Sequence, residues 1–479
     1  METLPSWFAS MHLVIAALVL FVGYLLLRPN RWRGNPPPGP SGWPVVGSMF
    51  ELGNRPEIFF TKTSERYGDV FRLNLGRKRV VVANSYETLA EAIVEKARVF
   101  ADRPQLLSFK LQEGGDQTLG VQFTRASEMQ RKKIKLVRAA FNPAIPDVAE
   151  RFDAVLPIEV ASLVQDVARE DGGPFDPHDV IEFCSAMSNV TGMLLYSKTL
   201  ELGSCLLIDW LPWLSWFPSA DVRELQALVR TMTGWHTDLI EEHRQTLNES
   251  SPRDFLDQLL IQQQTGKLMV SDADICRILD DLQSAGFNTA TANILWGIQL
   301  LVQNPDVQKK LQAEIDEVVG SGRAPTTKDC RNMPYLEATL WEIQRVGMPV
   351  PVPGVRAALR DTTLSGYDVP KGTIMLVNQA KIATDLANFP QPHRFDPSRH
   401  LDENGSVVTP EKKLMLFGNG LRICAGRHLA RDQMVIVMAN LLQRFTFRLP
   451  DGATAFDNVG STDGLVRFPL PYKIRAIPR

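Results

Sequence analysis

The chain has 479 residues, of which 44% are hydrophobic, so it is long enough to bury a large core in one or two domains. Basic and acidic residues nearly balance at a formal net charge of −2, which argues against a nucleic-acid-binding protein because such proteins carry a marked basic excess. The five cysteines are an odd number and form no C-x-x-C pair, which fits neither a disulfide framework nor a zinc site.

A long apolar stretch, residues 7–27, is the first predicted element. Its centre reads LVIAALVLFVGYLLL, and about 20 helical residues are enough to cross a hydrocarbon core of about 30 Å. Three arginines follow within residues 28–33, whereas only Glu2 is charged before it, so the positive-inside rule places the body in the cytosol. A cleaved signal peptide would instead have basic residues before the apolar run. We therefore predict a membrane anchor over residues 1–34.

Residues 35–40 read NPPPGP, a sequence that cannot form a helix and that favours an extended, stiff spacer between anchor and body. Residues 41–479 contain no internal repeat and no low-complexity tract. We therefore predict that they form one continuous domain.

Periodicity in this domain predicts a mainly α fold with small β-sheets. Alternating polar and apolar residues over 69–75 and an apolar run over 80–83 indicate two short strands joined by a turn. Residues 124–346 have an overwhelmingly helical pattern, and short strand-like segments return near 362–377 and at the C-terminus.

The longest predicted helix runs from about residue 271 to 302, with Ser271 as its cap. Gly286 lies near its middle, where glycine costs about 1 kcal/mol relative to alanine and needs a packing or functional reason. One reason is a close crossing with a second helix. The other is a local opening, in which a freed carbonyl and a nearby hydroxyl face a cavity.

The most informative segment is residues 417–426, which read FGNGLRICAG. Two glycines favour a tight loop, and an apolar helix starts directly after it. The N-terminus of that helix would favour the thiolate form of Cys424, because unpaired N–H groups and a positive dipole end lie there. Arg422 can pair with an anionic group across the loop.

This decapeptide matches the pattern F-x-x-G-x-R-x-C-x-G of the cytochrome P450 family at every fixed position. The resemblance implies a cytochrome P450 fold, haem b as cofactor and Cys424 as the axial ligand of the haem iron. It covers nearly the whole chain, and it is nearest to animal microsomal enzymes that hydroxylate steroids and foreign aromatic compounds. Glu342 and Arg345 resemble the E-x-x-R helix of the family, and Arg399 the second arginine, a set with a structural role.

The resemblance also implies the remaining site residues. The stretch Ala285–Thr289 resembles the A-G-x-D/E-T segment of the distal side, where Thr289 would hold a chain of waters that delivers protons. The family usually has an acid where this chain has Asn288, and an amide cannot exchange a proton at neutral pH. The cofactor contacts implied are Phe417, Gly418, Arg422, Gly426, Arg356, Ala285 and Gly286. Phe287, Val350 and Val352 would line an apolar pocket, with plain core packing as the alternative.

The implied activity is a monooxygenase that hydroxylates a lipophilic molecule, a steroid, lipid or aromatic xenobiotic. Electrons would come from NADPH through NADPH–cytochrome P450 reductase, with cytochrome b5 as a second candidate donor, because no dinucleotide fingerprint is visible in this chain. The expected location is the endoplasmic reticulum membrane, in contact with its lipids. Cations over residues 125–138 are candidates for the reductase-docking face, and a solvated basic face is the alternative.

Two departures from the family pattern leave other functions open. Asn288 leans toward a haem-thiolate isomerase or dehydratase that needs no external electrons. Only about a dozen residues separate Tyr196 from Asp209, where related enzymes have much of the helix that roofs the pocket. That shortening favours a low-turnover haem protein that carries lipid.

Overall fold

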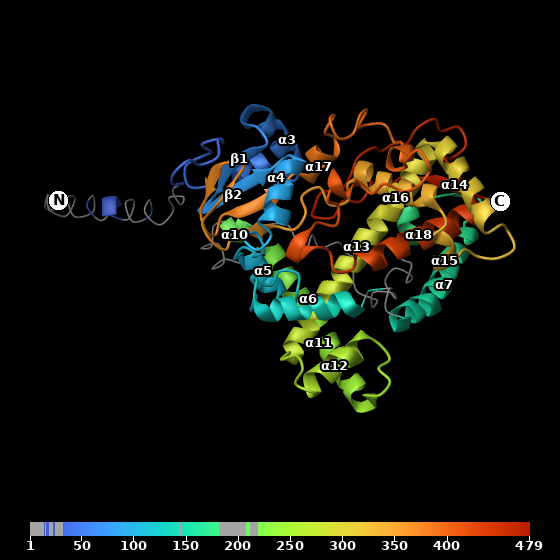
Figure 1. Ribbon diagram of the computed structural model, residues 1–479, viewed down its shortest axis with the longest axis horizontal. Helices are drawn as coiled ribbons and strands as arrows, with labels where there is room; N and C mark the ends of the chain where they lie inside the picture. Colours follow the sequence, from blue (N-terminus) through green and yellow to red (C-terminus); the bar gives the residue numbers. More distant parts are fainter. Residues whose placement is uncertain are drawn as a thin grey trace, which may run out of the picture.

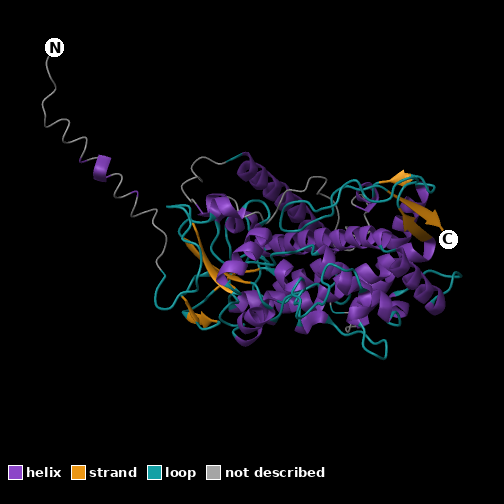
Figure 2. Cartoon of the chain, turned by 90° about the horizontal axis from the view of Figure 1, so that it is seen from above, coloured by secondary structure: helices purple, strands orange, loops and turns teal. Residues whose placement is uncertain are grey.

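Helices make up most of the part of the chain that the computed structural model describes, which comprises residues 14, 16–18, 23, 32–140, 142, 146–181, 207–210 and 219–479. Figure 2 shows one broad helical body, with the strands gathered toward its ends. The mainly α class with small sheets is therefore confirmed.

The helices are α2 Met49–Leu52, α3 Pro56–Tyr67, α4 Tyr86–Ala90, α5 Leu107–Gln112, α6 Glu128–Ala140, α7 Pro146–Arg169, α8 Pro177–Ile181, α10 Leu207–Trp210, α11 Ala220–Thr246, α12 Phe255–Gln264, α13 Asp272–Gln303, α14 Pro305–Val318, α15 Thr327–Cys330, α16 Pro334–Gly347, α17 Gln379–Ala383 and α18 Arg427–Arg444. Short turns of other helix types are the π-helix η1 Glu91–Glu95 and the 3-10 helices η3 Pro397–His400, η4 Pro410–Lys412 and η5 Gly420–Arg422. The strands are β1 Val70–Leu75, β2 Lys78–Ala83, β3 Pro174–Phe175, β4 Arg356–Ala357, β5 Thr362–Leu364, β6 Tyr367–Val369, β7 Ile374–Val377, β8 Phe445–Arg448 and β9 Ile474–Pro478.

The predicted strand pair near the N-terminus is present as β1 and β2, which are antiparallel. Strand β2 also pairs with β7 in parallel, and the four-stranded sheet has the order β1-β2-β7-β4. Its inner face consists of fully buried aliphatic and aromatic residues such as Phe71 and Val80. The strands predicted near residues 362–377 are β5, β6 and β7, of which β5 and β6 pair with each other. The strand predicted at the C-terminus is β9, which pairs with β8.

Helix α13 crosses the centre of the molecule and contacts α11, α16 and α18 (Figure 1). It begins, as predicted, at Ser271, whose side chain forms a capping box with Asp274. The helix continues unbroken through Gly286, which argues against a local opening there. The close helix crossing lies at Gly297 instead, where a Cβ would lie 3.1 Å from Ile343 Cδ1 and 3.3 Å from Met438 Cε.

The N-terminal predictions are tested only in part. Residues 7–27 lie almost entirely outside the described residues, and among the described helices none is long and apolar enough to cross a membrane. The proline-rich segment forms no helix or strand, and it is bound to the body: the N–H of Arg72 donates to Pro38 O at 2.8 Å. The backbone of Asn35 also exchanges hydrogen bonds of 2.7 Å with Asp368. These hydrogen bonds show that the segment is attached to the body and is not a free spacer.

Candidate active site

The loop of residues 417–426 leads directly into α18. It is closed by the N–H of Cys424, which donates to Phe417 O at 2.9 Å. At Gly420 the φ angle is 68°, and a Cβ would lie 2.4 Å from the carbonyl oxygen of Ile93. Only glycine fits such a position, so this residue lets the loop press against η1.

The Cys424 thiol experiences opposing effects on its charge. Burial raises its pKa, whereas the N–H of Gly426 and the cations Arg427 and Arg138 act to lower it. The side chain of Cys424 is exposed, so the thiol is accessible to a ligand. The start of α18 adds a positive dipole end, which favours the thiolate that an iron ligand must be.

Three neighbouring arginines have no carboxylate partner among the described residues. Arg356 is buried, Arg103 and Arg422 are half-buried, and none of them forms an ion pair with a described residue. Their guanidiniums bond only to backbone carbonyls, for example Arg422 Nε to Ala101 O at 2.8 Å. Arg356 Nη2 lies 3.8 Å from the position that a Cβ would take on Gly418 in the thiolate loop.

Burial lowers the pKa of all three guanidiniums, to about 10 for Arg103 and to about 9 for Arg356 and Arg422. Repulsion from Arg103 lowers the pKa of Arg356 and Arg422 further, whereas attraction by Asp281 and Asp102 partly offsets burial at Arg103 and Arg422. Such a cluster is costly unless an anionic group joins it. The cluster and the Cys424 thiol therefore fit haem, which carries both an iron to ligate and carboxylates to pair. Arg103 was not assigned a role from the sequence, because nothing in its local pattern marks it.

The distal residues lie on α13 as predicted. Ala285 is exposed although it is in the middle of a central helix. Thr289 Oγ1 donates to Ala285 O at 2.8 Å, which leaves its lone pairs free to accept from water. Asn288 Nδ2 donates to Ser284 O at 3.3 Å, so this amide is held by the helix itself.

The predicted pocket residues are not all brought together. Val352 packs in a hydrophobic cluster with Phe109 and Phe123, near the four-stranded sheet. Phe287 instead packs against the central cluster that also includes Phe417. Val350 is half-buried. The assignment of these residues to one pocket remains a prediction.

Glu342 on α16 accepts hydrogen bonds from both predicted arginines. Arg345 binds it bidentately at 2.7 and 2.8 Å, and Arg399 Nε donates at 3.0 Å. His400 Nε2 also lies 2.9 Å from Glu342 Oε2, a partner that sequence reasoning missed. Burial alone would raise the pKa of Glu342, but the hydrogen bonds from Arg345 and His400 outweigh it and hold the pKa at about 2.

This ion-pair cluster adjoins the thiolate loop through its neighbour in sequence. The ring of Trp341 meets that of Phe417 edge-on, with centroids 6.0 Å apart. Helix α16 therefore supports the first residue of the loop while its next residue, Glu342, holds the segment around Arg399. The role is structural, as the resemblance implies.

Helix α6 does not present all its cations to a partner. Lys133 is fully buried and bonds to Asp274, which contradicts its prediction as a docking residue. Arg138 Nη2 donates to the carbonyls of Leu421 and Ile423 at 3.3 Å, so it supports the thiolate loop. The cations of α6 that remain exposed are Arg131, Lys132 and Lys135.

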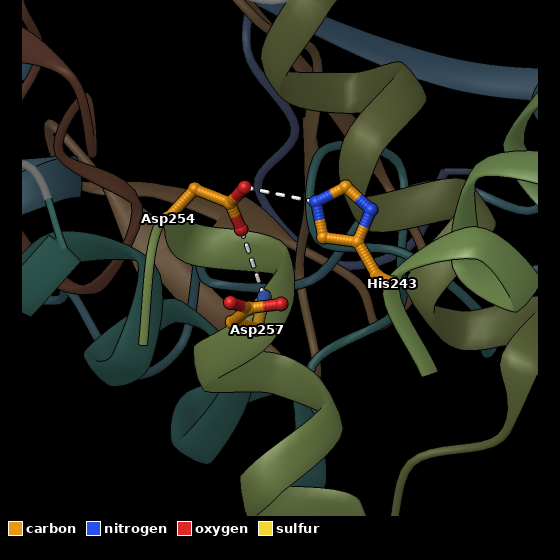
Figure 3. A group of neighbouring side chains, drawn as sticks. All are labelled: His243, Asp254 and Asp257. Carbon is orange, nitrogen blue, oxygen red and sulfur yellow. Dashed lines mark hydrogen bonds and ion pairs between the residues drawn. The ribbon is translucent and has the colours of Figure 1, made fainter. Parts of the chain in front are cut away.

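A second cluster of ionisable residues lies away from the loop, between α11 and α12 (Figure 3). His243 Nε2 is 2.9 Å from Asp254 Oδ2, and Asp254 caps α12 by accepting from the N–H of Asp257 at 2.9 Å. Both oxygens of Asp257 take the guanidinium fork of Arg253. A cation is thus already supplied by the protein, and the cluster fastens two helices together.

The comparisons with known proteins agree with this site. The family model described as Cytochrome P450 matches residues 37–476 of the chain. Cytochrome P450 2U1 of Mus musculus is 30% identical, over 96% of this chain and 94% of its own length. Cytochrome P450 1A1 of Cavia porcellus is 32% identical over 93% of each chain, and Cytochrome P450 1B1 of Mus musculus 30% identical over 96% of this chain and 90% of its own.

Proposed function

The chain belongs to the cytochrome P450 family, so it is a monooxygenase that binds haem b, and from this premise we propose that it hydroxylates a lipophilic small molecule. We further propose that NADPH supplies the electrons through NADPH–cytochrome P450 reductase, with cytochrome b5 as a second donor. The observation that carries the proposal is the exposed Cys424 thiol in a loop next to arginines that form no ion pair with a described residue.

In this assignment Cys424 would ligate the iron, and Arg103, Arg356 and Arg422 would bind the haem carboxylates. Phe417, Gly418 and Gly426 shape the loop around the sulfur. When bound, haem supplies the oxygen chemistry, which a thiolate axial ligand favours by donating electron density. The Gly426 N–H, together with Arg427 and Arg138, stabilises the negative charge on the sulfur.

On the distal side, the residues of α13 position water and protons. The Thr289 hydroxyl is committed as a donor to Ala285 O, so it holds a water by accepting from it. The Asn288 amide can orient a water but cannot give up a proton, so protons must pass along waters next to Thr289.

Reduced-CO difference spectroscopy of the full-length haem protein tests the ligand assignment. We expect the red-shifted Soret band that a thiolate ligand imposes, and its loss in Cys424→Ser with haem content retained. Cys330→Ser is a matched control, because burial raises the pKa of that thiol to about 12 and keeps it neutral. An unchanged band in Cys424→Ser would exclude the assignment.

Asn288 supports a second candidate, a haem-thiolate isomerase or dehydratase, because such enzymes need no acid beside the distal threonine. Turnover separates the two functions. Lipophilic candidates incubated with reductase should consume NADPH and yield a hydroxylated product. Product that forms equally well without NADPH would support the isomerase instead.

We also propose that the protein is held on the endoplasmic reticulum membrane by residues 1–34, with the domain in the cytosol. Large exposed hydrophobic residues next to the linker support contact with lipid: Trp43, Phe50 and Ile58 are 62%, 74% and 54% exposed. The exposed cations of α6 are the proposed contact for the reductase. Alkaline carbonate extraction of membranes tests the anchor, because a peripheral protein would be released.

A further inference from the structure

The strap, which we define as residues 119–124, is part of the connection between α5 and α6 (Figure 1). Its carbonyl groups hold two of the three arginines. Val121 O and Thr124 O accept from the two terminal nitrogens of Arg422, and Gln122 O accepts from Arg103 Nε at 2.8 Å. The position of the strap therefore decides where two of the candidate haem-carboxylate ligands point.

The amide groups of the strap are bound from the other side by two carboxylates. The N–H groups of Val121 and Gln122 donate to Asp281 Oδ2 at 2.6 and 2.8 Å, and that of Phe123 to Glu113 Oε1 at 3.3 Å. The strap therefore has the carboxylates of Asp281 and Glu113 on one side and the guanidiniums of Arg103 and Arg422 on the other.

Glu113 and Asp281 also converge on each other. Gly120 separates them, and a Cβ on Gly120 would lie 2.5 Å from Glu113 Oε2 and 2.7 Å from Asp281 Oδ2. Glu113 is 1% exposed and Asp281 9% exposed. Glu113 Oε2 has no hydrogen-bond partner among the described residues, although it points into this narrow space. Two carboxylates so close in a dry space cannot both be ionised at low cost.

The cations on the elements that pack against the pair form ion pairs with other carboxylates. Arg277 Nη1 pairs with Asp280 Oδ2 at 2.7 Å, and Asp280 also lies 2.8 Å from His236 Nδ1. Lys133 pairs with Asp274. Arg103 and Arg422 are bound to carbonyls of the strap, and both also attract Asp281 electrostatically. Burial, followed by repulsion from Asp281, accordingly raises the pKa of Glu113 to about 10, and burial raises the pKa of Asp281 as well.

We propose that Glu113 and Asp281 hold one proton between them and act as positioning residues, which fix the strap and thereby aim Arg422 and Arg103 at the haem carboxylates. The proton would lie in the space beside Gly120, where Glu113 Oε2 and Asp281 Oδ2 converge. When base removes this proton to solvent, two anions face each other across Gly120 and the strap is pushed away from them. The inference rests on the proposed function only in identifying the group that the arginines bind.

Hydrogen–deuterium exchange of the full-length holoprotein tests the pair directly. Once exchange is corrected for its intrinsic pH dependence, the wild-type strap amides should be protected at about pH 7 and lose protection as the pH rises toward about 10. Glu113→Gln keeps an acceptor for Phe123 and a permanent donor toward Asp281, so its strap should stay protected across this range. In Glu113→Ala the strap amides should be unprotected at both the low and the high end of this pH range. Glu403→Gln, at an exposed position, should behave as wild type.

Haem release to excess apomyoglobin gives a second readout. We expect Glu113→Ala to release haem about tenfold faster at neutral pH, the ratio that corresponds to about 1.4 kcal/mol, and Glu113→Gln to match the wild type. Wild-type protection that does not change with pH, or a Glu113→Gln variant as unprotected as Glu113→Ala, overturns the inference. Neither result depends on turnover, so failure of the monooxygenase proposal in the carbon monoxide assay would be seen separately.

Discussion

Asn288 is the residue at which this chain differs most in chemistry from an acid-assisted distal site. Its amide is held by Ser284 O and cannot exchange a proton. We predict that Asn288→Asp raises kcat on the order of tenfold, within the range that a positioned acid contributes. The fraction of consumed NADPH that appears as product should rise with it, as measured by NADPH oxidation and product quantification.

The control for this change is Asn288→Ala, which removes the hydrogen bond to Ser284 O without adding an acid. It should leave kcat within about twofold of the wild type if proton exchange is what limits the rate. Equal gains in both variants would show that release of the amide, not a new acid, is responsible.

Glu342 carries the largest expected single-residue effect on stability. It is fully buried against Arg345, Arg399 and His400, so Glu342→Gln leaves buried cations without their anion. We predict a loss of about 3 to 5 kcal/mol in the free energy of unfolding at neutral pH, measured by urea denaturation. Because the folded pKa of about 2 lies below the ordinary value, this contribution is present above about pH 4 and is lost as the pH falls toward 2.

Glu337→Gln on the same helix is the matched control. Its partner Arg431 and its own side chain are 35% and 27% exposed, so this ion pair should contribute less than about 1 kcal/mol. The difference in the free energy of unfolding between Glu342→Gln and Glu337→Gln should become smaller as the pH falls. A Glu342→Gln variant whose deficit is the same at all pH values would contradict the charge-based explanation.

At the scale of residues, the sequence predicts the groups that belong to short motifs. Cys424, Arg422, Glu342 and Arg345 each lie within ten residues of their signature partners, and the structure places the glutamate and the arginine in direct contact. Glu113 could not be found this way, because its partner Asp281 is 168 positions distant and only the fold brings the two carboxylates together.

Among the elements, α13 depends on close packing where it crosses its neighbours. A Cβ at Gly297 would lie 3.1 Å from Ile343 Cδ1, and a β-branched side chain would reach further into Ile343 and Met438. We predict that Gly297→Val lowers the free energy of unfolding by about 1 to 3 kcal/mol through overpacking, despite the poor helix propensity of glycine. Urea denaturation followed by circular dichroism measures this.

Gly234 on α11 provides the opposite case within the same fold. It is exposed, and nothing lies within 4 Å of the place where a Cβ would be. Gly234→Ala should therefore raise the free energy of unfolding by about 0.5 to 1 kcal/mol, because alanine restricts the unfolded chain and favours the helix. If Gly234→Ala lowered the free energy of unfolding as Gly297→Val does, the close packing at Gly297 would not explain the effect.

Periodicity and capping residues predict where elements lie better than what their polar residues do. Ser271 marked the start of α13 correctly, since a cap acts through local hydrogen bonds. Lys133 was wrongly assigned to an exposed basic face, because its ion partner Asp274 comes from a different helix. Gly286 was singled out as the mid-helix glycine, but the close crossing lies three turns later, at Gly297.

For the molecule as a whole, the proline-rich segment joins the predicted anchor to the sheet. Residues 35–40 could be recognised as extended from their prolines, but their attachment depends on Arg72 and Asp368, which are far apart in sequence. The segment therefore belongs structurally with the sheet.

This attachment predicts different outcomes for two deletions. Removal of residues 2–34 should leave the carbon monoxide spectrum and the unfolding midpoint of the domain unchanged, while the protein no longer sediments with membranes. Removal of residues 2–40 also deletes the three backbone hydrogen bonds to Asp368 and Arg72, each worth about 1 kcal/mol, so the free energy of unfolding should fall by about 2 to 3 kcal/mol. Urea denaturation of both proteins, with haem absorbance as the probe, measures the difference. Equal stability of the two proteins would mean that the proline-rich segment is only a spacer, as its composition alone suggested.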